Sequence, residues 1–262
     1  MTQSYDLRNR VVVVTGAASG IGRALALAFA LQEAELVLLD RSHDALQLVA
    51  QQLRGIAKVS AYGCDLSDDA AVLAVAEQLS AAHAQVDVLV NNAGVEYPTP
   101  LADTASGANA RWAQLLDNNV TSMARLTRAL LPCLAPGASI INQASIWGKT
   151  GVADFSADVA SKHAVIGLTR ALAWELGPRG IRVNAVCPGW IRTDAAMASL
   201  RSMAQTQGRT EAEVEREILA GQALPGMLTP ADIAGVYLFL ASEDARCMTG
   251  QSLVASNGEV MA

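Results

Sequence analysis

The chain alternates short, almost wholly apolar segments with longer stretches that have helical patterning. Residues 10–15 and 35–40 are rich in Val and Leu, which is typical of strands that are buried on both faces. Further strands are expected at residues 57–64, 86–91, 138–144, 181–186 and 251–254. Parallel strands need a crossover connection, and helices supply it. The pattern therefore predicts the α/β class: one doubly wound domain over residues 1–262, with a parallel sheet of about seven strands and helices on both faces.

Caps and stops mark the expected helices. Ser42 and Ser67 are expected to act as N-caps through their hydroxyl groups, and the pair Gly177-Pro178 is a strong stop signal. The expected helices cover residues 42–54, 67–83, 108–134 and 156–176, and a last helix follows Thr229. Residues 190–228 break the alternation after a strand's C-terminal end, where ligands bind in open α/β sheets. We expect a substrate lid there; two ordinary surface helices are the alternative.

Composition excludes several classes of protein. Of 262 residues, 52% are hydrophobic and 17% are charged, so the chain is not a disordered tail. The net charge of −6 argues against a nucleic-acid or anionic-membrane partner, because both favour a basic patch. Residues 1–10 are polar and contain no apolar core of a secretory signal. We therefore expect no nucleic-acid partner, no membrane partner and no export.

The cysteines indicate a reducing compartment. The four of them, Cys64, Cys133, Cys187 and Cys247, are each more than fifty residues from the next. No Cys-x-x-Cys pair or Cys/His cluster occurs, so we expect neither a zinc site nor a disulfide framework. A cytoplasmic location fits this usage best.

A glycine-rich turn joins the first strand to the first helix. It reads Thr15-Gly-Ala-Ala-Ser-Gly-Ile-Gly22. Glycines let the backbone turn tightly and approach a pyrophosphate, while the N-terminus of the next helix attracts negative charge. The spacing differs from the usual Gly-x-Gly-x-x-Gly, and a plain tight turn is the alternative. The position between a buried strand and a helix favours a Rossmann-type dinucleotide site, with contacts expected from Gly16, Ser19, Gly20, Ile21 and Gly22.

Asp40, at the end of the second strand, indicates which dinucleotide binds. Its carboxylate can accept hydrogen bonds from both hydroxyls of the adenosine ribose, and it would repel a 2′-phosphate. Arg41 is the opposing signal, because a guanidinium group can pair with that phosphate. We expect NAD as the cofactor, with NADP as the less favoured alternative.

Further motifs resemble those of the short-chain dehydrogenase/reductase family over essentially the whole chain. The matching residues are the turn over residues 15–22, Asp65-Leu66, Asn91-Asn-Ala-Gly94, Asn119, Ser145, Lys162, and Pro188-Gly189 with Thr193. The resemblance implies hydride transfer between NAD(P) and a small alcohol or carbonyl compound. It also implies a homotetramer, or failing that a dimer, because the family pairs helices across subunits and residues 110–131 and 156–176 carry excess apolar surface.

The resemblance assigns roles to individual residues. Ser145 would hold the substrate oxygen, Asn119 a proton-relay water, and Lys162 the nicotinamide ribose. Further cofactor contacts are implied at Asp65, Leu66, Asn92, Ala93, Gly94, Pro188, Gly189, Ile191 and Thr193. Tyr97, Trp147 and Trp190 lie where the family builds its substrate pocket, with ordinary core packing as the alternative. Glu96 is either a contact for a polar substituent or a solvated side chain.

The catalytic tyrosine of the family is missing. It belongs four residues before the lysine, but the sequence there reads Asp158-Val-Ala-Ser-Lys162. An aspartate has an ordinary pKa near 3.9, and we expect Lys162 to lower the pKa of Asp158 further. The group would then be ionised and unable to donate a proton, and its carboxylate is shorter than a phenol. We expect impaired carbonyl reduction, with cofactor binding retained.

Three explanations for Asp158 stay open. The first is an engineered or erroneous replacement in an active enzyme. The second is a natural chain that binds a dinucleotide as a sensor or scaffold and does not reduce carbonyls. The third is a water molecule that bridges Asp158 and the substrate and gives weak activity.

Overall fold

The strands of the computed structural model form one parallel sheet. The structure describes residues 5–261, so the first four residues of the polar N-terminal segment, and residue 262, lie outside it. The strands are β1 (Val11–Thr15), β2 (Glu35–Asp40), β3 (Val59–Gly63), β4 (Val86–Asn91), β5 (Leu134–Gln143), β6 (Arg182–Pro188) and β7 (Ser252–Ala255). Their order in the sheet is β3-β2-β1-β4-β5-β6-β7. The prediction of a seven-stranded parallel sheet is confirmed for the described residues.

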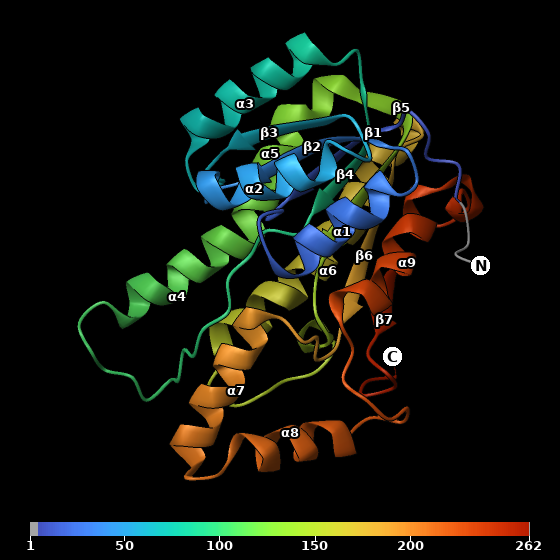
Figure 1. Ribbon diagram of the computed structural model, residues 1–262. Coiled ribbons are helices and arrows are strands. Elements are labelled where there is room, and N and C mark those ends of the chain that lie inside the picture. Colours follow the sequence, from blue (N-terminus) through green and yellow to red (C-terminus); the bar gives the residue numbers. More distant parts are fainter. Residues whose placement is uncertain (1–4, 262) are drawn as a thin grey trace.

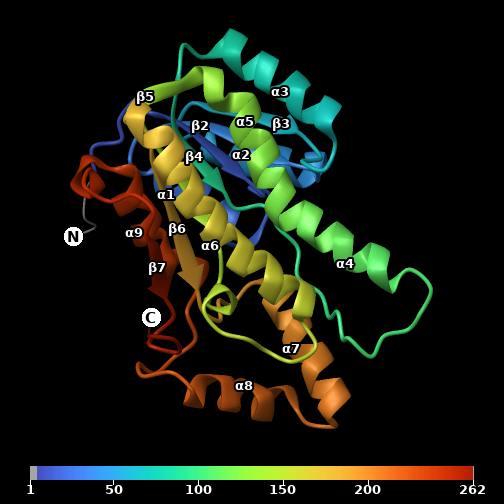
Figure 2. The ribbon, with the colours of Figure 1, turned by 180° about the vertical axis from the view of Figure 1, so that it is seen from behind.

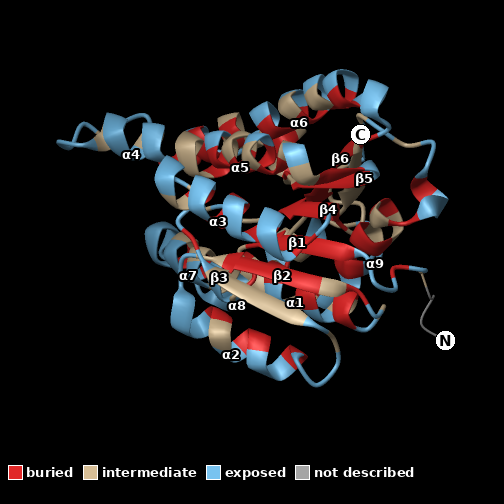
Figure 3. Cartoon of the chain, turned by 90° about the horizontal axis from the view of Figure 1, so that it is seen from above, coloured by how far each residue is buried: buried red, intermediate tan, exposed pale blue. Residues whose placement is uncertain are grey.

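Helices cover both faces of the sheet. They are α1 (Gly20–Ala30), α2 (His43–Leu53), α3 (Asp69–Ala82), α4 (Ala108–Leu116), α5 (Ser122–Leu130), α6 (Ser156–Leu176), α7 (Asp194–Gln207), α8 (Glu211–Ala220) and α9 (Pro230–Ala241). Helices α1, α2 and α9 lie on one face (Figure 1), and α3, α5 and α6 lie on the other (Figure 2). Seen from above, the buried strands lie between these two helical layers (Figure 3). This arrangement explains why the central strands β1 and β4 are buried along their whole length.

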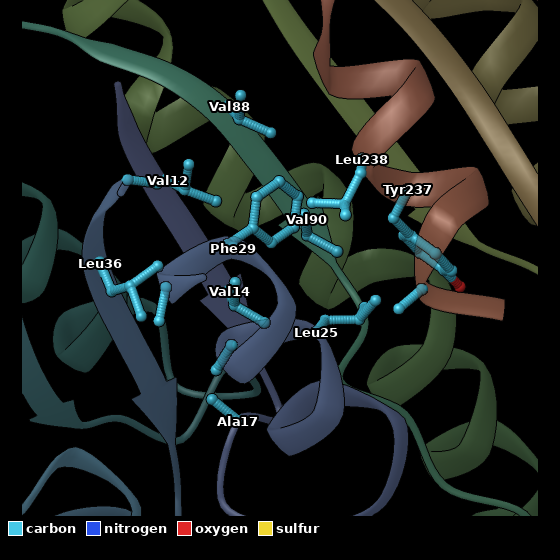
Figure 4. Close-up of a cluster of buried hydrophobic side chains, with 14 of the residues drawn as sticks. Val12, Val14, Ala17, Leu25, Phe29, Leu36, Val88, Val90, Tyr237 and Leu238 are labelled. Atoms are coloured by element: carbon cyan, nitrogen blue, oxygen red, sulfur yellow. The ribbon is translucent and has the colours of Figure 1, made fainter. Parts of the chain in front are cut away.

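Alternate residues of each strand face different layers. Val12 and Val14 of β1 pack with Phe29 of α1 and Tyr237 of α9 in one cluster (Figure 4). Val13 belongs to the cluster on the other face, beneath α3 and α5. The sheet is therefore anchored from both sides at β1, the strand that leads into the glycine-rich turn.

The predicted helix over residues 108–134 is present as one helical stretch over residues 108–133, but this stretch is not a regular α-helix. The segment consists of α4, a π-helical turn (Asp117–Thr121), α5 and a short 3-10 turn (Leu131–Cys133). Asn119 belongs to the π-helical turn, and its side chain bonds both the N–H and the carbonyl of Val95. Single π-helical turns within α-helices are frequent at functional sites. Pro132 lacks the N–H group needed to continue the helix, and β5 therefore begins at Leu134, before the predicted residue 138.

The caps agree with the sequence in part. Thr229 precedes α9 as predicted, and its N–H and hydroxyl both donate to Asp232. Ser42 is at the N-cap position of α2, but its side chain makes no capping bond. The prediction that Ser67 caps the third helix is wrong: its hydroxyl donates to Asp65, and the carboxylate of Asp68 accepts the first N–H groups of α3. A carboxylate at the positive end of a helix is also favoured by the helix dipole.

The strand order places a crevice at a known position. The chain moves outward from β1 in one direction through β2 and β3, and then returns to β4 on the other side of β1. Ligands bind at such switch points, beyond the carboxyl ends of the strands.

Among residues 5–261, no helix is long and apolar enough to cross a membrane.

Candidate active site

The glycine-rich turn packs closely on the turn that follows β4. The hydroxyl of Thr15 accepts hydrogen bonds from the N–H groups of Asn92 and Ala93, each at 2.9 Å. A Cβ atom on Gly22 would lie 2.1 Å from the carbonyl oxygen of Gly16, so only glycine fits there. Gly16 itself has a φ of 64°, which a residue with a side chain rarely adopts. The two turns at the switch point therefore form one rigid floor.

Neither a capping side chain nor an acidic side chain of the first turn compensates the positive end of the α1 helix dipole. Ser19 is the N-cap residue, its side chain makes no capping bond, and the first turn holds no acidic residue. The first N–H groups of a helix have no partner within the helix, and they attract an anion when no carboxylate is present. The geometry suits a pyrophosphate.

A cavity of about 340 Å³ extends from this turn along the ends of β1, β2, β3 and β4. The predicted residues that line it are Gly16, Ser19, Gly20, Ile21, Asp40, Arg41, Asp65, Leu66, Asn92, Ala93, Gly94 and Thr193. The carboxylate of Asp40 is held in place by the N–H groups of Ala18, at 3.0 Å, and Ser42, at 2.9 Å. The first cavity thus brings together most of the residues expected to contact the dinucleotide.

Sequence reasoning missed some lining residues of this cavity. They include Leu39, Ser42, Cys64, Val95, Asn118, Gln143, Asp194 and Ala195. The rule that ligands lie at the carboxyl ends of parallel strands would have found Leu39, Cys64 and Gln143. Burial and the nearby Asp65 raise the pKa of the Cys64 thiol to about 11, so it is a neutral wall of the cavity and not a reactive group.

A second cavity of about 210 Å³ adjoins the first. The two share Ile21, Asn92, Gly94, Val95, Gln143, Thr193 and Ala195 in their linings. Predicted residues that line the second cavity are Ser145, Trp147, Lys162, Pro188, Gly189, Trp190 and Ile191. The start of α7 closes part of it, beyond the end of β6 (Figure 1). Ser145 and Lys162 therefore line one cavity together with residues 188–191, and this cavity shares lining residues with the first.

Four predicted site residues line neither cavity: Gly22, Tyr97, Asn119 and Asp158. Gly22 serves the packing of the turn. The hydroxyl of Tyr97 donates to the carbonyl oxygen of Arg111 at 2.7 Å, and its ring lies 5.5 Å from the Arg111 guanidinium. Tyr97 thus packs against α4. Asn119 lies behind the cavity and holds the residue at position 158.

Asp158 is enclosed in the protein. The residue is 1% exposed, and its Oδ1 accepts a hydrogen bond from Asn119 Nδ2 at 3.0 Å. Ser161 Oγ lies 3.5 Å from the same oxygen, whereas Oδ2 has no partner among the described residues. The carboxyl group therefore points into a buried polar cluster.

The expectation that the pKa of Asp158 is lowered is wrong. Burial raises the pKa of Asp158 above its ordinary value, and this outweighs the lowering by Lys162, Ser161 and Asn119. Desolvation disfavours the charged form of a carboxyl group, and one nearby cation does not compensate for it here. The carboxyl group of Asp158 does not line the cavity that Ser145 lines, so its position separates it from that space.

We compare the free energy of unfolding of the Asp158→Asn variant with that of the unmodified chain. We expect this difference to shift in favour of the variant as pH rises from about 4 to 7. The pKa of Asp158 is raised in the folded state, so its favourable contribution is complete below its unfolded pKa of 3.8 and is lost as pH rises through the folded value. Thermal unfolding of both proteins across this range measures the difference, with the exposed Asp154→Asn as control. A difference that shrinks with rising pH would show that Lys162 stabilises an Asp158 carboxylate.

Comparison with known proteins agrees with this geometry. The family model described as enoyl-(acyl carrier protein) reductase matches residues 16–259. D-xylose 1-dehydrogenase of Caulobacter vibrioides is 36% identical over 248 residues, which are 94% of this chain and 93% of the relative.

Two solved structures also match. The 3-oxoacyl-[acyl-carrier protein] reductase of Brucella melitensis with bound NAD has a TM-score of 0.84 and 30% identity, over 98% of this chain and 93% of the other. L-sorbose reductase of Gluconobacter frateurii, complexed with NADPH and L-sorbose, has a TM-score of 0.91 and 26% identity, over 99% and 100%. The sequence, the strand order and these matches agree that the chain belongs to the short-chain dehydrogenase/reductase family of oxidoreductases.

Proposed function

We propose that this chain binds NAD(H) in preference to NADP(H) and is built for the interconversion of a secondary alcohol and a carbonyl compound, with its proton-transfer residue replaced by Asp158. The observation that carries the proposal is the contrast around the second cavity. Ser145 and Lys162 line it, but Asp158 is 1% exposed and does not. Two residues suited to binding therefore line the second cavity, whereas residue 158, where the family has its proton donor, does not.

The residues present fit a nicotinamide dinucleotide. The bare glycine turn and the uncapped start of α1 suit its pyrophosphate, and Asp40, beside the first cavity, suits an adenosine ribose. When bound, the cofactor supplies or accepts a hydride. Lys162 would hold the second ribose, and Ser145 would orient the substrate oxygen by donating a hydrogen bond. The Ser145 hydroxyl oxygen itself accepts the N–H of Trp147 at 3.1 Å, which leaves its proton for the substrate.

Proton transfer is the weak step in this proposal. A positioned acid is worth roughly 10²- to 10⁴-fold in rate, and an acid must lie within hydrogen-bond reach of the substrate oxygen. Asp158 is bonded to Asn119 behind the cavity, so a direct proton transfer requires it to move. This supports impaired activity in the chain as it stands.

Binding and turnover together test the proposal. We expect NADH to bind, as measured by the change in its fluorescence, and a panel of ketones, sugars and secondary alcohols to react very slowly, as measured by nicotinamide absorbance. No binding of either dinucleotide would contradict the assignment of the first cavity. Fast turnover of a panel member would contradict the assigned defect at Asp158.

A second candidate function is dinucleotide binding without catalysis, as in a sensor or scaffold. The observation that favours it is the buried cluster of Asp158 with Asn119 and Ser161, which stabilises residue 158 away from the substrate. Restoration of turnover by a tyrosine at this position separates the two functions, because a scaffold need not keep a working substrate pocket.

Residues 190–228 are proposed to act as a lid over the substrate. They contain α7 and α8, which lie beyond the end of β6 (Figure 1). Trp190, Ile191 and Ala196 line the second cavity. We also propose a cytoplasmic location, which the four free cysteines of the described chain support.

We expect the chain to form a homotetramer. The α6 helix leaves Trp174 87% exposed, next to a helix face that a partner copy can cover. Light scattering at micromolar concentration should give the mass of four chains, or of two as the smaller assembly. Trp174→Glu should lower that mass, whereas Leu73→Glu, at an apolar residue of α3 that is 58% exposed, should not. A monomeric natural chain would rule the prediction out.

A further inference from the structure

The second cavity has an unusual distribution of charge. Its charged lining residues among those described are Lys162 and two carboxylates, Glu96 and Glu259. Neither carboxylate belongs to a family motif: Glu96 lies two residues after the motif that ends at Gly94, and Glu259 lies in the segment that follows β7. Neither has a Lys, Arg or His nitrogen of the described chain within 4.0 Å.

Glu259 is fixed against the cavity wall by a turn. Asn257 and Gly258 have φ values of 53° and 80°, and the turn returns the chain toward Gly189. A Cβ atom on Gly189 would lie 2.7 Å from the Cβ of Ser256 and 2.9 Å from Glu259 Oε2. The absence of a side chain at Gly189 therefore makes room for the carboxylate beside the end of β6.

The carboxylate of Glu259 has few hydrogen-bond partners among the described residues. The N–H of Trp190 donates to Oε2 at a long 3.4 Å. Burial raises the pKa of Glu259, and the nearby N–H of Trp190 and amide of Gln222 lower it by less. A half-buried carboxylate without a cation loses solvation that a ligand's hydrogen-bond donors can replace.

Glu96 also lines the second cavity; the residue is solvent-exposed overall, and its carboxylate meets the lid. Its carboxylate accepts a hydrogen bond from the hydroxyl of Ser199 in α7 at 3.0 Å. Burial and the nearby Asp158 raise the pKa of Glu96, and Lys162 opposes this. An anionic substrate would face both carboxylates at close range, and a cationic one would face Lys162.

We propose that the cavity selects an uncharged polyhydroxy carbonyl compound or polyol, of the sugar type, and that Glu259 is the specificity-determining residue that accepts its hydroxyl groups. Such a substrate donates hydrogen bonds to the two carboxylates and accepts them from Lys162 and Ser145, so no charge is left unmatched. A simple hydroxy acid is excluded by repulsion. This inference rests on the proposed function, because it treats the second cavity as the substrate site.

Probe binding to the NADH-loaded chain tests the inference without requiring turnover. The probes are D-glucose, its cationic analogue D-glucosamine, 3-hydroxybutyrate, and the uncharged 3-hydroxybutyramide, each titrated by calorimetry. We expect D-glucose to bind at least about fivefold more tightly than D-glucosamine, and the amide more tightly than the acid. In Glu259→Gln we expect the Kd of D-glucose to rise about tenfold, because a charge-assisted hydrogen bond becomes a neutral one, and the binding of 3-hydroxybutyrate to improve. Glu175→Gln, an exposed change of the same kind on α6, should alter neither.

The possible failures are distinguishable. If NADH does not bind to the natural chain, the proposed function fails with the inference. If NADH binds but D-glucose binds no more tightly than 3-hydroxybutyrate, or does not bind, the inference alone is overturned. D-glucosamine binding more tightly than D-glucose, with the advantage lost in Glu259→Gln, would overturn the choice of an uncharged substrate. An unchanged Kd for D-glucose in Glu259→Gln would overturn the role of Glu259.

Discussion

Asp158→Tyr is expected to raise kcat for a carbonyl substrate by roughly 10²-fold or more. A phenol at this position, four residues before Lys162, extends beyond the place where the Asp158 carboxyl group ends. It would reach toward the cavity that Ser145 and Lys162 line, and the positive charge of Lys162 would lower its pKa toward neutrality. Steady-state kinetics on both proteins measures the ratio, and the substrate is first identified with the tyrosine version.

The affinity for NADH serves as the internal control for this change. We expect it to change much less than kcat, because residue 158 lies outside both cavity linings and would act mainly in proton transfer. Lys162→Ala in the tyrosine version should weaken both cofactor binding and the restored activity, because Lys162 would hold the nicotinamide ribose and also lower the pKa of the tyrosine. The proposal fails if the aspartate chain turns over the same substrate as fast as the tyrosine version. Asp158, or a water it holds, would then be a competent acid.

The natural chain should bind NADH at least tenfold more tightly than NADPH. The carboxylate of Asp40 is fixed beside the first cavity by the N–H groups of Ala18 and Ser42, so it cannot turn away from a 2′-phosphate without losing both bonds. A tenfold preference corresponds to about 1.4 kcal/mol, which a carboxylate facing a phosphate should exceed. Fluorescence titration with each reduced cofactor measures the ratio.

Two variants test which residue sets the preference for NADH over NADPH. Asp40→Asn should reduce the ratio of the two affinities, chiefly through tighter NADPH binding, because the repulsion is removed while the side chain keeps its size. Arg41→Ala should weaken NADPH binding and leave NADH binding nearly unchanged. Equal or tighter binding of NADPH by the natural chain would instead mean that Arg41, which also lines the first cavity, sets the preference.

The sequence by itself determined the strands, the glycine-rich turn and most of the first cavity. These features depend on local causes. Val11–Thr15 and Glu35–Asp40 are apolar enough to form only buried strands, and a strand that leads into a glycine turn and a helix has one common arrangement. The contact expected at Asp40 follows from its place at the carboxyl end of a strand, whereas the contacts expected at Asp65 and Asn92 are implied by the family resemblance.

Only the tertiary structure decided the features that depend on burial and distant contacts. Sequence spacing put Asp158 beside Lys162 and suggested a lowered pKa, but Asn119, 39 residues away, and the surrounding core withdraw the carboxyl group from water. Desolvation is a property of the whole environment, so no local pattern reports it. The same holds for Tyr97, which packs against Arg111, and for Glu259, which the fold of the C-terminal segment returns to the second cavity.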